Sequence, residues 1–147
     1  MHTQCTEMAR LAGAVLSNPE CEVPEVRWEF VGCPDAFRQE LSQACQQRAT
    51  FHAANWEARS HLNRWHVLLY HNPDVVETFG RTVAEAMRAG CVPVVDNAGG
   101  FCEQIGPQNG YLCSELQEFM TALEELSSRE TWKKRSTCCR ETAEDLF

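Results

Sequence analysis

Glu77-Thr78-Phe79-Gly80-Arg81-Thr82-Val83-Ala84-Glu85 is the stretch from which the architecture of this chain is best inferred. Two carboxylates stand at its ends, with seven residues between them. The apolar run Val67-Leu68-Leu69-Tyr70 precedes it and is typical of a buried parallel strand. The composition of residues 81–89 favours a helix, and Gly90 suits the left-handed position after a helix end. The stretch is therefore predicted to join a strand to a helix.

The beginning of that helix is a predicted anion site. Helix N-termini expose unpaired N–H groups and about half a positive charge, which favours a diphosphate at the backbone of residues 78–82. Glu77 flanks this position, and Glu85 lies roughly 7 Å along the helix axis at about 1.5 Å per residue. Carboxylates only accept hydrogen bonds and suit vicinal sugar hydroxyls. The pattern predicts a nucleotide-sugar site, with Glu77 at the donor sugar and Glu85 at the ribose.

Further motifs occur in order around this stretch. They are Trp28-Glu29-Phe30-Val31-Gly32, Thr50-Phe51-His52, the E-x7-E run from Glu77 to Glu85, Glu85-Ala86-Met87, Gly90, Pro93-Val94-Val95, and Gly99-Gly100 with Glu103. As an ordered set they resemble the C-terminal, donor-binding domain of retaining glycosyltransferases with the GT-B architecture, the family called group 1. The resemblance covers residues 27–146.

This resemblance implies a fold, an activity and a set of site residues. The expected fold is α/β, a Rossmann-like three-layer α/β/α arrangement with a parallel sheet, as a single domain over residues 1–147. The expected activity is hexosyl transfer from a nucleoside-diphosphate sugar, with no metal and no cofactor beyond the donor. The implied catalytic residue is Glu77, and the implied donor-binding residues are Glu77, Thr78, Phe79, Gly80, Arg81, Glu85, Gly99 and Gly100.

Two features of full-length family members are not recognised in this sequence. One is an N-terminal acceptor domain, and the other is a first strand that ends in a loop with a basic residue. The only lysines of the chain are Lys133 and Lys134, near its far end. We therefore expect the acceptor domain to be a missing partner of this chain.

Composition restricts the class of protein. A length of 147 residues fits one domain, and 44% hydrophobic with 23% charged residues is ordinary for a globular fold. The net charge of -8 argues against nucleic-acid partners, which bind clusters of lysine and arginine. No apolar run has the length of a membrane span or follows a basic start as in a signal peptide, so we expect a cytoplasmic protein without a transmembrane segment.

The nine cysteines are odd in number and form no C-x-x-C pair, so neither a zinc site nor a disulfide framework is predicted. In a reducing compartment they act as small hydrophobic residues.

Trp56, Trp65 and Trp132 are predicted to be packing anchors. His52 and His71 follow strands and reach either structural partners or the ligand.

Helix and strand signals alternate along the chain, which favours a parallel sheet covered by helices. Helices are predicted over 3–16, 36–47, 55–64 with Asn55 as N-cap, 80–89, a short piece to 105, 115–126 and 130–145; strands are predicted over 28–31, 50–52, 67–70, 92–95 and 111–113. Loops after these strands carry Glu77, Gly80, Asp96, Gly99 and Gly100. Such loops meet at one crevice, where the tandem glycines either face the donor or simply make a tight turn.

Two other functions remain open at this point. Loss of the first strand would uncover a strand edge and apolar surface, which favours self-association or binding of another protein. A sugar-nucleotide epimerase or a phosphorylase on the same fold is the third possibility, because a fold alone does not fix an activity.

Overall fold

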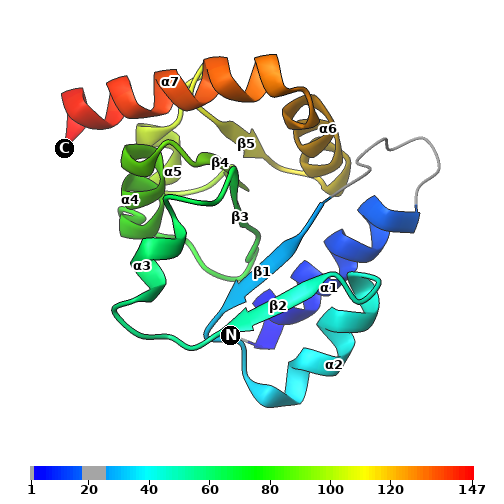
Figure 1. Ribbon diagram of the computed structural model, residues 1–147. Helices are drawn as coiled ribbons and strands as arrows, with labels where there is room; N and C mark the ends of the chain where they lie inside the picture. The colour runs from blue at the N-terminus through cyan, green and yellow to red at the C-terminus, as the bar shows by residue number, and fades with distance from the viewer. Residues whose placement is uncertain (1, 18–25) are drawn as a thin grey trace.

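Helices and strands alternate along the chain in the computed structural model, which describes residues 2–17 and 26–147 (Figure 1). In chain order the elements are α1 (His2–Ser17), β1 (Trp28–Val31), α2 (Asp35–Ala44), β2 (Ala49–His52), α3 (Ala58–His61), β3 (Val67–Tyr70), α4 (Arg81–Ala89), β4 (Val92–Asp96), α5 (Phe101–Gln104), β5 (Tyr111–Cys113), α6 (Leu116–Ser127) and α7 (Arg129–Leu146). The predicted α/β class is confirmed.

All strand pairs are parallel, but in the described residues they form two sheets instead of the single predicted one. β1 pairs with β2, and the second sheet has the order β3-β4-β5, with Val67 opposite Val92 and Val94 opposite Tyr111. β4 lies in the centre and is buried at all its residues. In the part of the chain that the structure describes, β3 pairs with a strand on one side, its residues are half-buried, and the prediction of a buried strand was wrong.

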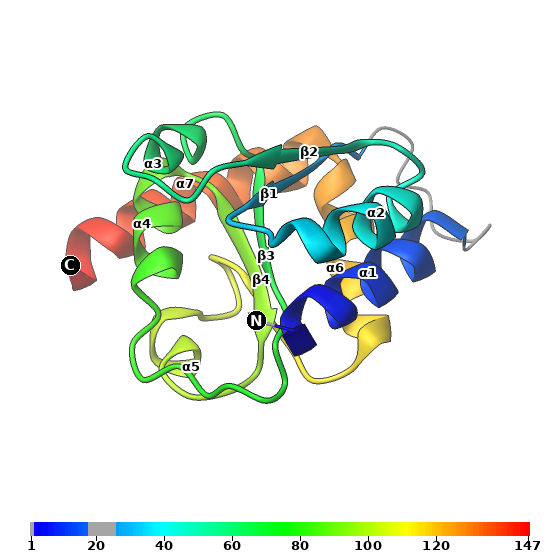
Figure 2. The ribbon, with the colours of Figure 1, turned by 90° about the horizontal axis from the view of Figure 1, so that it is seen from below.

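Helices cover both faces of the three-stranded sheet, as predicted. α4 and α7 pack against each other and against β4, while α6 packs on β4 and β5 and contacts α1 (Figure 2). The core between these layers contains large side chains with 0% or 1% exposure, among them Leu11, Val15, Met87, Val94 and Phe119. Burial of this apolar surface is the main stabilising contribution to the fold.

The C-terminal end of α4 is closed as the sequence predicts. Gly90 adopts a left-handed conformation with a φ of 84°, which side chains with a Cβ rarely adopt. Two side chains of α7 cap the carbonyls at this end: Ser136 Oγ donates to the Gly90 carbonyl at 2.6 Å, and Arg140 donates to the Ala89 carbonyl at 3.2 Å. The C-terminal end of α4 is thereby fixed to α7.

The segment after β2 differs from the prediction. The helix expected over 55–64 is reduced to Ala58–His61, and the Asn55 carbonyl accepts a turn hydrogen bond from the Ala58 amide in place of side-chain capping. Leu62 is the buried residue of this region, so the segment lacks the apolar stripe that stabilises a longer helix. Trp56 is 82% exposed, and its predicted role as a packing anchor was wrong.

The other two tryptophans pack as predicted. Trp65 lies against a small cluster formed by Leu62, Ala86 and Cys91. The indole N–H of Trp132 donates a 2.9 Å hydrogen bond to the His66 carbonyl. Both residues therefore connect helices to the segment that leads into β3.

The described cysteines are free thiols, and most are buried, as expected for small hydrophobic residues. Burial raises the pKa of Cys45, Cys91, Cys113 and Cys139 to about 12, so these thiols stay protonated at neutral pH. Cys21 lies outside the described residues. Among the described helices, none combines the length and the apolar character needed to cross a membrane.

Candidate functional site

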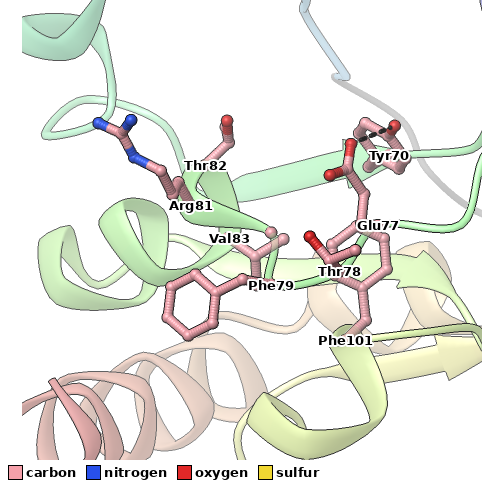
Figure 3. Close-up of a pocket in the computed structure, with 9 residues that line it drawn as sticks. Tyr70, Glu77, Thr78, Phe79, Arg81, Thr82, Val83 and Phe101 are labelled. Atoms are coloured by element: carbon pink, nitrogen blue, oxygen red, sulfur yellow. Dashed lines mark hydrogen bonds between the residues drawn. The ribbon is translucent and has the colours of Figure 1, made fainter.

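A pocket of about 280 Å³ opens where the loop after β3 leads into α4 (Figure 3). It is lined by Tyr70, Glu77, Thr78, Phe79, Gly80, Arg81, Thr82, Val83 and Phe101. The structure therefore gathers residues 77–81, all predicted from sequence to bind a donor, around one hollow at the carboxyl end of a parallel strand. Ligands of open α/β sheets bind at this end of the strands.

The first turn of α4 supplies free hydrogen-bond donors to this pocket. The Gly80 carbonyl accepts from the amides of Val83 at 3.0 Å and Ala84 at 3.3 Å. The N–H groups of Arg81 and Thr82 find no hydrogen-bond partner among the described residues. Since both residues line the pocket, the positive end of the helix faces it with unpaired donors.

Gly80 allows this geometry. Its φ is 77°, and a Cβ at this position would lie 2.5 Å from the ring of Phe101. The missing side chain is therefore required both by the backbone conformation and by the aromatic ring beside it. Phe101 in turn contacts the Tyr70 ring edge-on, with centroids 5.3 Å apart.

Glu77 is held in place by the strand end. The hydroxyl of Tyr70 donates a 3.0 Å hydrogen bond to Glu77 Oε1 (Figure 3). Burial, together with the neighbouring Glu77, raises the pKa of Tyr70 to about 12, so the phenol keeps its proton. One carboxylate oxygen of Glu77 is thus fixed by the protein, and the carboxylate lies at the pocket, where a ligand can donate a hydrogen bond to it.

The tandem glycines support the pocket from outside it. The Gly100 amide donates a 2.7 Å hydrogen bond to the Glu77 carbonyl, and a Cβ on Gly100 would lie 2.4 Å from the Thr78 carbonyl oxygen. Gly99 approaches the same loop and has a φ of 56°. Neither glycine is among the described residues that line the pocket. Their geometry is that of a tight contact between two loops.

A buried carboxylate anchors the start of the same loop. Asp96, at the end of β4, accepts 2.6 Å hydrogen bonds from His71 Nδ1 and from the Asn72 amide. His71 Nε2 lies 3.4 Å from Glu7 Oε2 on α1. The hydrogen bond to Asp96 outweighs desolvation and raises the pKa of His71, which favours the imidazolium between two carboxylates. His71 therefore has the structural role that the sequence left open.

Glu85 is placed differently from Glu77. Its Oε1 accepts a 2.9 Å hydrogen bond from Arg59 of α3 and lies 4.0 Å from Arg81 Nη2. Glu85 is not among the described residues that line the pocket. Arg81 has a side chain that is 77% exposed. The second carboxylate of the motif thus lies outside the hollow, with an oxygen, Oε2, that has no partner among the described residues.

Tyr70, Val83 and Phe101 line the pocket and were missed from the sequence, whereas Thr82 belongs to the predicted anion site at residues 78–82. Tyr70 carried one usable signal, a hydroxyl on the last residue of an otherwise aliphatic strand. Phe101 gave none, because its ring reaches the pocket through contacts with Tyr70 and Gly80, which lie far earlier in the sequence.

Several glycosyltransferases of known structure share this fold. The pneumococcal O-GlcNAc transferase GtfA, solved with UDP and GlcNAc, superposes with a TM-score of 0.73 at 16% identity, over 100% of this chain and 31% of GtfA. HepE from Anabaena, solved with UDP and glucose, gives 0.78 at 18% identity, over 100% of this chain and 42% of HepE. TarM from S. aureus, solved with UDP among its ligands, superposes with a TM-score of 0.80 at 13% identity, over 99% of this chain and 30% of TarM.

At these identities the likeness shows the fold, and this chain spans less than half the length of each of these proteins. No curated protein sequence matches the chain. The family described as Glycosyl transferases group 1 matches residues 14–145, which is most of the sequence and includes the whole pocket. This chain therefore belongs to the group 1 glycosyl transferases.

Proposed function

We propose that this chain is the donor-binding portion of a glycosyltransferase that takes a sugar from a nucleoside-diphosphate sugar. The observation that carries the proposal is the pairing, in one pocket, of free amides at the start of α4 with the carboxylate of Glu77. The amides suit a diphosphate, and the carboxylate suits a sugar hydroxyl beside it.

The chemistry follows from the charge that develops during transfer. As the bond between the sugar and the diphosphate breaks, negative charge grows on the departing phosphate. The N–H groups of Arg81 and Thr82 and the dipole of α4 are already oriented and stabilise that charge without rearrangement. Glu77 accepts a hydrogen bond from the donor sugar and fixes the position of its reacting carbon.

Glu85 completes the donor site in this proposal. Arg59 and Arg81 both approach Oε1, so Oε2 is available to accept a hydrogen bond from a ribose hydroxyl. Gly99 and Gly100 contribute by holding the Glu77 loop. The acceptor would bind to a second domain, since this chain corresponds to 30% to 42% of the length of the solved enzymes.

The ligands of the related structures make UDP and UDP-sugars the first compounds to test. Calorimetric titrations would compare UDP, UDP-glucose, UDP-GlcNAc and GDP-mannose against the wild-type chain and its Glu77→Gln and Glu85→Gln variants. Glu77→Gln should weaken binding of the sugar-bearing ligand about tenfold and leave free UDP unchanged, whereas Glu85→Gln should weaken both.

Glu124→Gln is the matched control, because Glu124 is an exposed acid of α6 away from the pocket. It should bind like the wild type. Absence of binding by every nucleotide, or equal effects of Glu77→Gln and Glu124→Gln, would refute the proposed donor site.

Protein association is a second candidate function, favoured by a specific feature. β1 and β3 are edge strands in the described residues, and the nearby side chains of Val31, Val75 and Val76 are 39%, 43% and 67% exposed. Uncovered strand edges with apolar neighbours favour pairing with another chain. Light scattering that finds a dimer unaffected by Glu77→Gln and Glu85→Gln, with no nucleotide binding, would favour this function instead.

A further inference from the structure

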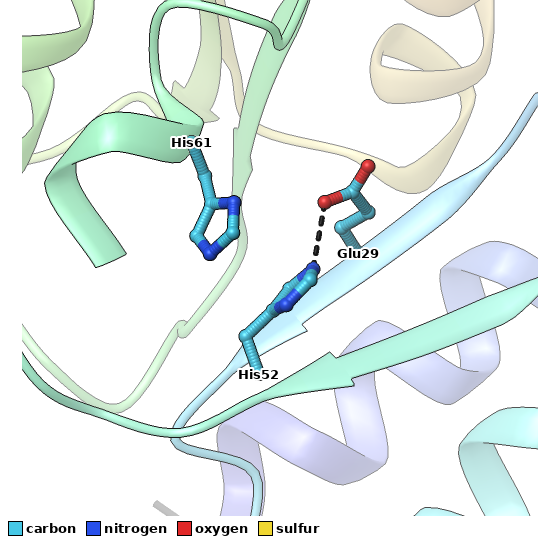
Figure 4. Close-up of side chains that lie close together, drawn as sticks. All are labelled: Glu29, His52 and His61. Carbon is cyan, nitrogen blue, oxygen red and sulfur yellow. Dashed lines mark hydrogen bonds and ion pairs between the residues drawn. The ribbon is translucent and has the colours of Figure 1, made fainter. Parts of the chain in front are cut away.

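We infer that Glu29, His52 and His61 form a binding site for a divalent transition metal ion, with Zn²⁺ as the best-suited ion. Glu29 lies on β1, His52 on β2 and His61 on α3 (Figure 4). One ligand atom from each residue lies within 4.8 Å of the other two. None of the three is among the described residues that line the pocket, so the site is separate from the proposed donor site.

The donor set has the chemistry of zinc. Imidazole nitrogens and a carboxylate oxygen are ordinary zinc ligands, at distances of about 2.0–2.2 Å from the ion. Tetrahedral geometry at those distances separates neighbouring ligand atoms by roughly 3.4 Å. His52 Nε2 and Glu29 Oε2 are 2.7 Å apart, so these two atoms must separate slightly to share an ion, and His61 must rotate inward. Three protein ligands leave the fourth position to water.

The three side chains are partly exposed, which leaves room for this adjustment, and contacts with neighbouring rings already hold His61 in place. His52 and Glu29 are 21% and 30% exposed, so an ion can enter from solvent. The ring of His61 lies between two aromatic neighbours, with centroids 4.1 Å from His52 and 5.8 Å from Trp65.

Arg64 opposes the ion and therefore provides a test. Its guanidinium contacts Nδ1 of His61, and because guanidinium only donates, the neutral His61 ring then carries its proton on Nε2. Coordination through Nε2 requires that proton on Nδ1, and coordination through Nδ1 requires the contact with Arg64 to be broken, so Arg64 must turn away in either case. Removal of the Arg64 side chain should favour the metal-binding tautomer and remove a repelling charge.

The consequence of metal binding would be structural. No backbone ladder joins β1–β2 to β3–β4–β5 in the described residues. An ion held by both strands of the first sheet and by the helix that leads into β3 would connect the two sheets. The sequence predicted no metal site, because the ligands come from three separate elements and form no local motif.

The test is calorimetric titration of the purified chain with Zn²⁺ at pH 7.5. A Cys102→Ser background removes the exposed described thiol as a competing ligand. His61→Ala and Glu29→Gln should each weaken Zn²⁺ binding at least tenfold, and Arg64→Gln should strengthen it several-fold. His66→Ala is the control, since His66 is exposed and contacts Trp132 rather than this cluster, and it should bind like the background.

Cobalt identifies the ligand atoms independently of affinity. Co²⁺ bound by nitrogen and oxygen gives weak visible bands, and it lacks the intense near-ultraviolet charge-transfer absorption of a cobalt thiolate. Absence of Zn²⁺ binding, a thiolate spectrum, or an affinity that His61→Ala and Glu29→Gln leave unchanged would overturn the inference.

Discussion

The hydroxyl of Tyr70 donates a 3.0 Å hydrogen bond to Glu77 Oε1. Tyr70 is the last residue of β3, whereas Glu77 lies in the loop that follows. A residue fixed by a strand therefore determines where the loop carboxylate points. Tyr70 acts on the proposed ligand through Glu77, which makes it a positioning residue in the donor site.

Tyr70→Phe should weaken binding of a UDP-sugar by roughly three- to tenfold, because it removes the hydrogen bond that positions Glu77, and a typical hydrogen bond contributes about 0.5–1.5 kcal/mol. Binding of UDP alone should be unchanged, since UDP lacks the sugar that Glu77 contacts. Calorimetry measures both affinities. In a Glu77→Gln background the further change to Tyr70→Phe should have little effect, and full additivity of the two variants would contradict the positioning role.

Gly100→Ala should destabilise the fold by about 1–3 kcal/mol and abolish donor binding, because the new Cβ would lie 2.4 Å from the Thr78 carbonyl oxygen. Gly106→Ala is the matched control, since a Cβ there meets no atom within 4 Å. Urea unfolding of both variants measures the difference. Equal stability of the two proteins would show that the two loops do not depend on this contact.

His71→Gln should destabilise the protein more at pH 5.5 than at pH 9. The pKa of His71 is raised by Asp96 and Glu7, so the stabilisation is fully present below the unfolded value of about 6.5 and is lost as the pH rises through the folded value. Unfolding measured across this range tests the sign. His66→Gln, for which no ion pair is found in the described residues, should show a weaker pH dependence.

Phe119→Ala should lower the free energy of unfolding by about 3–5 kcal/mol, because the ring is 0% exposed and its removal leaves a cavity. Trp56→Ala removes a larger side chain but should change stability by less than about 1 kcal/mol, since Trp56 is 82% exposed and its ring is contacted by Arg59. A comparable loss in both variants would mean that Trp56 packs in solution.

Local signals in the sequence predicted the helix of the pocket well. The helix-forming run and Gly90 located α4 and its left-handed end, and the loops that carry Glu77 and Gly100 do meet beyond the strands. These features depend on residues close together in the chain or on the general rule for parallel sheets. The division into two sheets could not be predicted from short stretches of sequence, because it depends on which strands pair with one another in the folded chain.

Partners distant in sequence explain the remaining differences. Glu85 pairs with Arg59, which lies 26 residues earlier in the chain, and the sequence around neither residue predicts that contact. The sequence predicts Tyr70 only as a strand residue, whereas in the structure its hydroxyl donates a hydrogen bond to Glu77. The α3 segment was predicted to extend over residues 55–64 with Asn55 as its N-cap, but a segment without an apolar stripe gains too little from packing to form a longer helix.

The hydrogen bond from the Gly100 amide to the Glu77 carbonyl has a thermodynamic consequence for any ligand of the pocket. The two loops are already ordered by folding, so the backbone around the pocket is preorganised. Little backbone entropy is therefore lost when a ligand binds. Recognition by this pocket should accordingly resemble the docking of a rigid surface, with side-chain rotation as its main adjustment.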